Sequence, residues 1–210
     1  MSDELMIQAA AMLSEVFIAP PGEALITAKA KPAAREDLRN LGLALLASPA
    51  ADQLCKILTD TPSEQLTADL QRSYTRLFEG VFPRETVSPY ESHWQASGES
   101  AVRSMNAALR ALDIRVSEKC AEPVDHISIQ LSTYAAALLD GRRDIAADVA
   151  RNLSVWVPAF FTAVISRDQS QFYAQHAELL SAFVTAAREY SPDSTILTSP
   201  KIQQREGEDA

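Results

Sequence analysis

Apolar residues in this chain recur at intervals of three and four, which is the spacing of one face of an α-helix. Leu5, Ala9, Met12 and Val16 follow this spacing until Pro20-Pro21-Gly22 interrupts it. Glycine is rare, whereas alanine and leucine are abundant, and this composition favours helices. We expect an all-α, single-domain helical bundle. Its helices are predicted over residues 5–17, 38–46, 61–81, 98–112, 123–139, 142–153, 156–165 and 172–187.

Local signals predict where two of these helices begin. Thr61 is expected to be an N-cap, with Pro62 at the first helical position and Glu64 completing a capping box. Pro123 is expected to start a later helix in the same way. Asp125 then falls in the first turn, where the exposed N–H groups of a helix favour a carboxylate.

The segment over residues 82–94 differs from the helical pattern around it. It places Phe82, Tyr90 and Trp94 among prolines, glutamates and a histidine. The prolines disfavour a continuous helix. We therefore expect an ordered aromatic loop between two helices.

The chain divides into one folded region and a tail. Residues 1–190 carry the helical pattern and are expected to form one domain. Residues 191–210 contain breakers and charge clusters without a sustained period, so a flexible tail is expected there. Ile114-Arg115-Val116 is too short to pair as a strand without a visible partner, so we interpret it as a connector.

Charge and cysteine content narrow the class of protein. The 19 basic and 28 acidic residues give a net charge of −9, which disfavours nucleic acid as a partner. The acidic N-terminus lacks the cationic region of an export signal, and the uncharged run over residues 152–166 is short for a membrane span. Cys55 and Cys120 form no metal-binding motif and are interpreted as reduced cysteines, although sequence alone leaves a disulfide open. We expect a cytoplasmic protein.

The polar stretch Glu122-Pro123-Val124-Asp125-His126 is the strongest candidate for chemistry, because the common nucleotide-binding, hydrolase and zinc motifs are missing. Asp125 and His126 are suitable for acid–base catalysis. Taken alone, however, the stretch is better explained as a structural helix start. Upstream, Tyr74, Leu77 and Phe78 share one helical face and are expected to be at least partly core.

Taken in order, these motifs resemble the TorD/DmsD/NarJ family of chaperones for molybdenum-cofactor oxidoreductases. The resemblance rests on Tyr74-x-x-Leu77-Phe78, on Ser88-Pro89-Tyr90-Glu91-Ser92-His93-Trp94 and on Glu122 to His126. Leu153-Ser154-Val155-Trp156 is similar to a further segment of the family, although Asn152 stands where many relatives have histidine.

The resemblance implies an all-helical protein without catalytic activity. It would bind the N-terminal segment of an apoenzyme, often a twin-arginine signal peptide, until the cofactor is inserted. No cofactor of its own is expected, although some relatives bind guanine nucleotide. Some relatives also form domain-swapped dimers, so the expected state is a monomer or a dimer.

Physical chemistry suggests how such a peptide would bind. Glu122 and Asp125 can accept hydrogen bonds from arginine, and His126 can orient a carboxylate or contact the peptide. An apolar segment needs aromatic anchors in a groove. The predicted peptide-binding residues are Glu122, Pro123, Asp125, His126, Tyr90, Trp94, Phe82, Tyr74, Leu77 and Phe78.

Three alternatives stay open on the sequence. One is a chaperone for a metalloenzyme that is not exported, and another is a small hydrolase that uses Asp125 and His126. The third is a helical scaffold without a ligand.

Overall fold

The computed structural model describes residues 1–80, 85–95, 98–117 and 120–190. Within these residues the structure is all-α, as predicted, and contains no β-strand. Residues 191–210 and Phe82, on which predictions were made, lie outside the described ranges. The helices are α1 (Asp3–Ile18), α2 (Glu23–Lys29), α3 (Pro32–Ala44), α4 (Ser48–Asp60), α5 (Ser63–Phe78), α6 (Glu91–Trp94), α7 (Gly98–Ala111), α8 (Ile127–Leu139), α9 (Arg143–Arg167) and α10 (Phe172–Tyr190).

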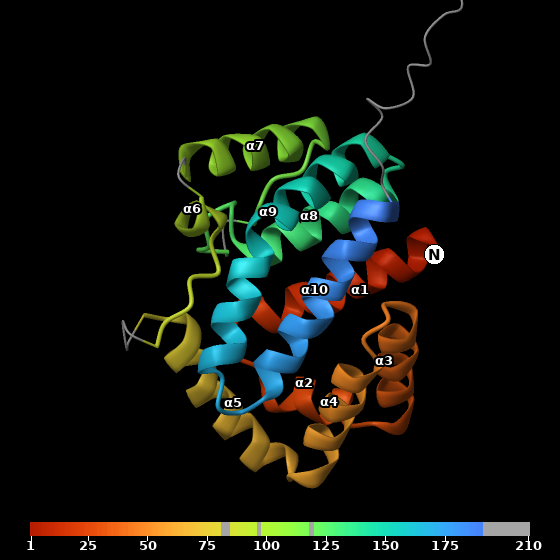
Figure 1. Ribbon diagram of the computed structural model, residues 1–210, viewed down its shortest axis with the longest axis vertical. Helices are drawn as coiled ribbons and strands as arrows, with labels where there is room; N and C mark the ends of the chain where they lie inside the picture. Colours follow the sequence, from red (N-terminus) through yellow and green to blue (C-terminus); the bar gives the residue numbers. More distant parts are fainter. Residues whose placement is uncertain (81–84, 96–97, 118–119, 191–210) are drawn as a thin grey trace, which may run out of the picture.

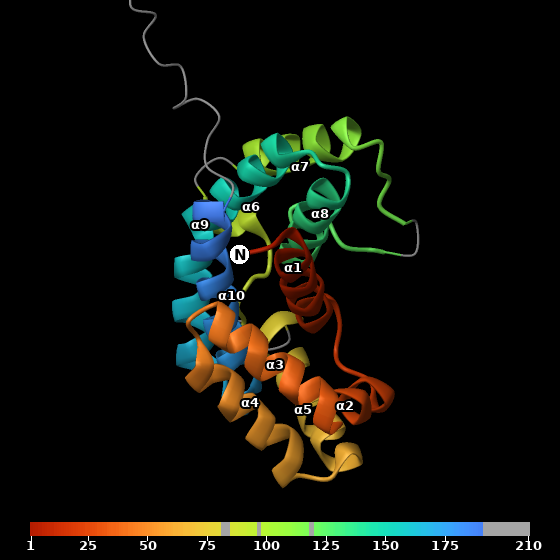
Figure 2. The same cartoon turned by 90° about the vertical axis from the view of Figure 1, so that its right-hand side faces the viewer.

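The long helices α9 and α10 run antiparallel along one side of the molecule and connect its two ends (Figures 1 and 2). At one end, α8 packs between α1 and α9, and α7 lies across the top. At the other end, α4 packs against α3 and α10, and α2 against α5. The short helix α6 contacts both α7 and α9, so the predicted aromatic loop lies against this bundle.

The structure corrects several predicted helix boundaries. Helix α4 was not predicted, because Ser48-Pro49 was interpreted as the end of a helix, whereas Pro49 lies in the first turn of a new one. Helices α2 and α6 were also missed. The cap of α5 is Pro62 and makes no side-chain cap bond, so the predicted Thr61 cap is wrong. Residues 114–116 form no regular element, which confirms the connector interpretation.

Helix α9 joins two predicted helices into one. Pro158 lies inside it on the exposed side, where the hydrogen bond that proline cannot donate is tolerated. By length and composition alone, this helix could cross a membrane. Its Trp156, Phe160 and Val164 side chains are at most 1% exposed, however, as in a core helix of a globular protein.

The centre of the core is an aromatic cluster. The Tyr74 and Phe78 rings contact each other, and Phe78 also contacts Phe17, Phe160 and Tyr173. The buried Tyr74 hydroxyl donates a hydrogen bond to the Phe17 carbonyl at 3.1 Å. Leu77 is also buried. The prediction that Tyr74, Leu77 and Phe78 belong to the core is confirmed.

Candidate functional site

Two motifs that are distant in sequence pair through their backbones. An isolated antiparallel bridge links Tyr90 with His126. The backbone N–H of residue 127 donates to the carbonyl of residue 89 at 2.9 Å, and that of residue 91 donates to the carbonyl of residue 125 at 3.1 Å. We call residues 89–91 and 125–127 the paired motif. It unites the aromatic loop with the polar stretch that the sequence singled out.

Asp125 holds this pairing together from a buried position. Its side chain is 1% exposed, and Oδ2 accepts a hydrogen bond from the Ser92 backbone N–H at 3.0 Å. Ser92 lies in the first turn of α6, so Asp125 caps a helix that belongs to another segment. The Asp125 carbonyl also accepts from Gln130 Nε2 at 3.0 Å. Asp125 therefore contacts the protein interior rather than solvent.

The predicted helix start at Pro123 is wrong, because α8 begins at Ile127. The Pro123 carbonyl instead accepts from the His126 N–H at 3.0 Å and closes a turn. His126 is the N-cap, and its Nδ1 accepts from the Ser128 N–H at 3.1 Å. Local signals assigned residues 125–127 to the first helical turn. In the structure these residues instead pair through their backbone with residues 89–91.

The imidazole of His126 is kept neutral. Burial lowers the pKa of His126, and the Glu122 and Asp125 carboxylates oppose this shift less strongly. An Nδ1 that accepts a hydrogen bond must also be unprotonated. The ring packs edge-on against Tyr90, with centroids 5.3 Å apart. His126 is thus a structural link between α8 and the aromatic loop.

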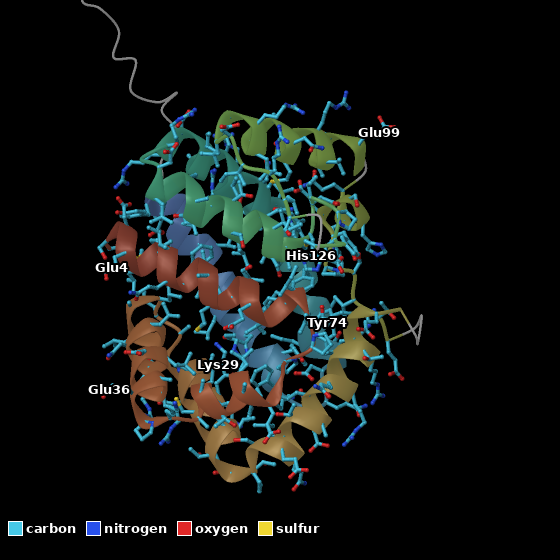
Figure 3. The ribbon with its side chains drawn as sticks, turned by 180° about the vertical axis from the view of Figure 1, so that it is seen from behind. Glu4, Lys29, Glu36, Tyr74, Glu99 and His126 are labelled. Atoms are coloured by element: carbon cyan, nitrogen blue, oxygen red, sulfur yellow. The ribbon has the colours of Figure 1, made fainter. Side chains whose placement is uncertain are left out.

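Glu122 and Tyr90 form the accessible part of the site. The Tyr90 hydroxyl donates to Glu122 Oε2 at 2.6 Å, and both side chains are half-buried. Pro123 beside them is exposed. Figure 3 shows His126, which pairs with Tyr90, on the same side of the molecule as Tyr74. Beside the paired motif, the Glu122 carboxylate is therefore the acidic group that a ligand can reach, since Asp125 and Glu91 are buried.

Glu91 is a buried carboxylate whose importance the sequence did not reveal. It is 2% exposed and accepts hydrogen bonds from Gln95 at 2.6 Å and from Gln130 at 2.8 Å. Burial raises the pKa of Glu91, and the nearby Asp125 carboxylate adds to the shift. Among the described residues, no ion pair involves Glu91, Glu122 or Asp125. In the described part of the chain, the site therefore holds three carboxylates that are not paired with a cationic side chain.

A groove lies between the aromatic loop and α9. The Trp94 indole N–H donates to the Ser88 carbonyl at 2.9 Å, and its half-buried ring packs edge-on against Phe160. The ring lines a cavity of about 370 Å³ between the aromatic loop and α9. On α9 it is lined by both apolar and polar residues, which are Ala159, Thr162, Ala163, Ser166 and Arg167.

The outer face of α9 continues this groove as an apolar strip. No charged residue occurs over residues 152–166. Val155 is 65% exposed and Ile165 is 42% exposed. The strip consists of the exposed residues Val155, Pro158, Ala159, Thr162 and Ile165. Their spacing places them on one helix face.

The structure thus sorts the predicted site residues into groups. Tyr90, Glu122, Pro123, Asp125 and His126 come together in or beside the paired motif. Trp94 lines the groove. The core residues support the loop from behind, since the Leu77 carbonyl accepts from the Val87 N–H at 2.6 Å. That all of these residues bind a peptide stays a prediction.

Comparison with known proteins assigns the chain to a family. Residues 28–178 match the family described as Nitrate reductase delta subunit, which is well over half of the chain. A similar protein is "Chaperone protein TorD" of Aeromonas salmonicida (strain A449), which is 32% identical over 127 residues. The match covers 54% of this chain and 58% of that relative, so the chain spans little more than half the length of the relative. The chain therefore belongs to the nitrate reductase delta subunit family, the TorD/NarJ group of redox-enzyme maturation chaperones, which are not enzymes.

Proposed function

We propose that this chain binds the N-terminal, twin-arginine signal segment of a molybdenum-cofactor oxidoreductase and holds it until the cofactor is inserted. The observation that carries the proposal is the accessible Glu122 carboxylate, which is held by Tyr90 of the same aromatic loop that lines the groove with Ser88 and Trp94. A twin-arginine signal has the complementary order of groups, with two guanidinium groups ahead of an apolar segment. The proposal assigns the chain no cofactor of its own.

In this proposal, Glu122 binds an arginine of the peptide. One of its oxygens accepts from the Tyr90 hydroxyl, which leaves the other oxygen for a guanidinium N–H. Asp125 is too buried to contact the arginine without rearrangement, so its role is to position the loop through Ser92. His126 positions Tyr90 by ring contact and by the backbone bridge.

The apolar part of the signal lies along the Trp94 groove and the apolar strip of α9. A helical peptide would place its apolar face on Val155 and Ile165, in the helix-in-groove manner. Trp94 is the anchor, because a half-buried indole offers a large contact area at low entropic cost. The absence of charge over residues 152–166 suits an uncharged segment.

Such a chaperone acts in the cytoplasm, before the enzyme is exported or assembled. A second candidate is a chaperone for a metalloenzyme without a twin-arginine signal. In that case the same groove would take a different apolar segment, and the identity of the bound subunit distinguishes the two.

Affinity purification of the tagged full chain from native cytosol tests the proposal. We expect a molybdoenzyme subunit with its signal peptide intact to be recovered. Recovery should fall for Glu122→Gln and stay unchanged for Glu36→Gln, a matched substitution at an exposed glutamate on α3 (Figure 3). A purification that yields no redox-enzyme subunit, from cells that express such enzymes, would refute the proposal.

A further inference from the structure

A second cavity, of about 520 Å³, lies between α1, α3 and α10 and shares no lining residue with the groove. This volume is within the range of about 300–1,000 Å³ that is typical of small-molecule sites. Its apolar walls include Met12, Leu38, Leu41, Leu58 and Phe172. Gln8, Asp37 and Asn40 also line it. Nothing in the proposed chaperone function uses this cavity.

His176 presents an unpaired acceptor to this cavity. The residue is 2% exposed, and its Nδ1 lies 2.8 Å from the Phe172 carbonyl. Because a carbonyl only accepts hydrogen bonds, Nδ1 carries the proton and Nε2 of the neutral ring is an acceptor. Burial lowers the pKa of His176 to about 3, so the ring is neutral at physiological pH. Nε2 has no hydrogen-bond partner among the described residues.

Lys29 supplies a positive charge to the same cavity. Its ammonium group lies 3.0 Å from the Glu15 carboxylate, and the two side chains are 20% and 48% exposed. Figure 3 shows Lys29 on the side of α2 that faces α1, which carries Glu15. A partly exposed pair of this kind contributes little to stability, so another carboxylate can replace Glu15. Lys29 and His176 both line the cavity. The charge of Lys29 also lowers the pKa of His176.

We propose that this cavity binds a medium-chain fatty acid that carries a hydroxyl group near its carboxylate. The carboxylate pairs with Lys29, and the hydroxyl donates to Nε2 of His176. The hydrocarbon chain lies among Met12, Leu38 and Leu41. The hydroxyl gives Nε2 a donor that a plain fatty acid lacks.

Isothermal titration calorimetry with 3-hydroxydecanoate, decanoate and decanol tests the proposal on the full chain. We expect 3-hydroxydecanoate to bind about tenfold more tightly than decanoate, and decanoate more tightly than decanol. Each methylene added to the chain should tighten binding about fourfold, as its burial predicts. If none of the three binds, or if all three bind with equal affinity, the proposal is wrong.

Variants then assign the binding to the cavity. Lys29→Met should abolish the preference for decanoate over decanol, whereas Lys31→Met, at an exposed lysine nearby, should retain it. His176→Phe should abolish the preference for the hydroxy acid, with folding checked by circular dichroism. Met12→Trp should fill the cavity and remove binding. Unchanged binding to Met12→Trp, or unchanged preferences in Lys29→Met, would overturn the assignment.

Discussion

Asp125 and Glu122 are three residues apart in sequence, but their substitutions should affect different properties. Asp125→Ala should lower the stability of the fold, whereas Glu122→Gln should lower the affinity for the peptide. Asp125→Ala removes a buried, charge-assisted hydrogen bond to the Ser92 N–H. Such a bond contributes about 1.5–3 kcal/mol, and the N–H that is left unpaired costs about 1–3 kcal/mol. We expect unfolding to become about 3 kcal/mol more favourable. For a chain of this size, the melting temperature should fall by roughly 10 °C.

Glu122→Gln should leave stability nearly unchanged. The amide oxygen still accepts from the Tyr90 hydroxyl, and the side chain is only half-buried. A surface change of this kind stays within about 0.5 kcal/mol. Affinity for a twin-arginine peptide should fall about tenfold, or about 1.4 kcal/mol, because a charge-assisted hydrogen bond to arginine is lost.

Urea unfolding followed by circular dichroism measures stability, and calorimetry with a signal peptide measures affinity. Glu36→Gln is the matched control for the loss of one charge. The reasoning is refuted if Asp125→Ala is as stable as the original chain yet loses peptide binding. That result would make Asp125 the direct contact. It is also refuted if Glu122→Gln binds the peptide as tightly as the original chain.

Three further substitutions test neighbouring parts of the site. Burial lowers the pKa of His126, so its contribution is complete above the unfolded value of about 6.5 and is lost as the pH falls below it. His126→Asn can still cap α8 but does not titrate, so urea unfolding between pH 7 and 5 should show a weaker pH dependence; an unchanged dependence contradicts this. Tyr74→Phe should cost about 1 kcal/mol, through the lost bond to Phe17, with peptide affinity unchanged in calorimetry. Trp94→Ala should weaken peptide binding more than tenfold, and an unaltered affinity would exclude the groove.

Helical periodicity was sufficient to predict the fold class and most of the long helices. It failed where local signals have two meanings. Ser48-Pro49 was interpreted as a helix end but starts α4, since proline suits a first turn as well as a break. Helix α9 was divided between residues 153 and 156 in the sequence-based prediction, whereas it is one helix over Arg143–Arg167. Helix α2 is short and has one buried residue, Ile26, so no apolar face marks it.

The site was predictable in composition but not in geometry. The aromatic loop and the polar stretch were both recognised, yet their backbone pairing joins segments that no local pattern relates. Because of that pairing, α8 begins only at Ile127. Asp125, one of the two carboxylates expected to bind arginine, is buried. Glu91 was noted only as one charge within the loop. Its burial depends on Gln130, a partner that only the folded chain supplies.

The most direct test of the central claim is a double-mutant cycle between Glu122 and the two arginines of the bound signal peptide. The original chain and Glu122→Gln are titrated with the twin-arginine peptide and with its twin-glutamine version. We predict a coupling energy of at least about 1 kcal/mol, because contacting charged groups are not additive. Additivity within about 0.3–0.5 kcal/mol, which is the behaviour of independent sites, would contradict the account.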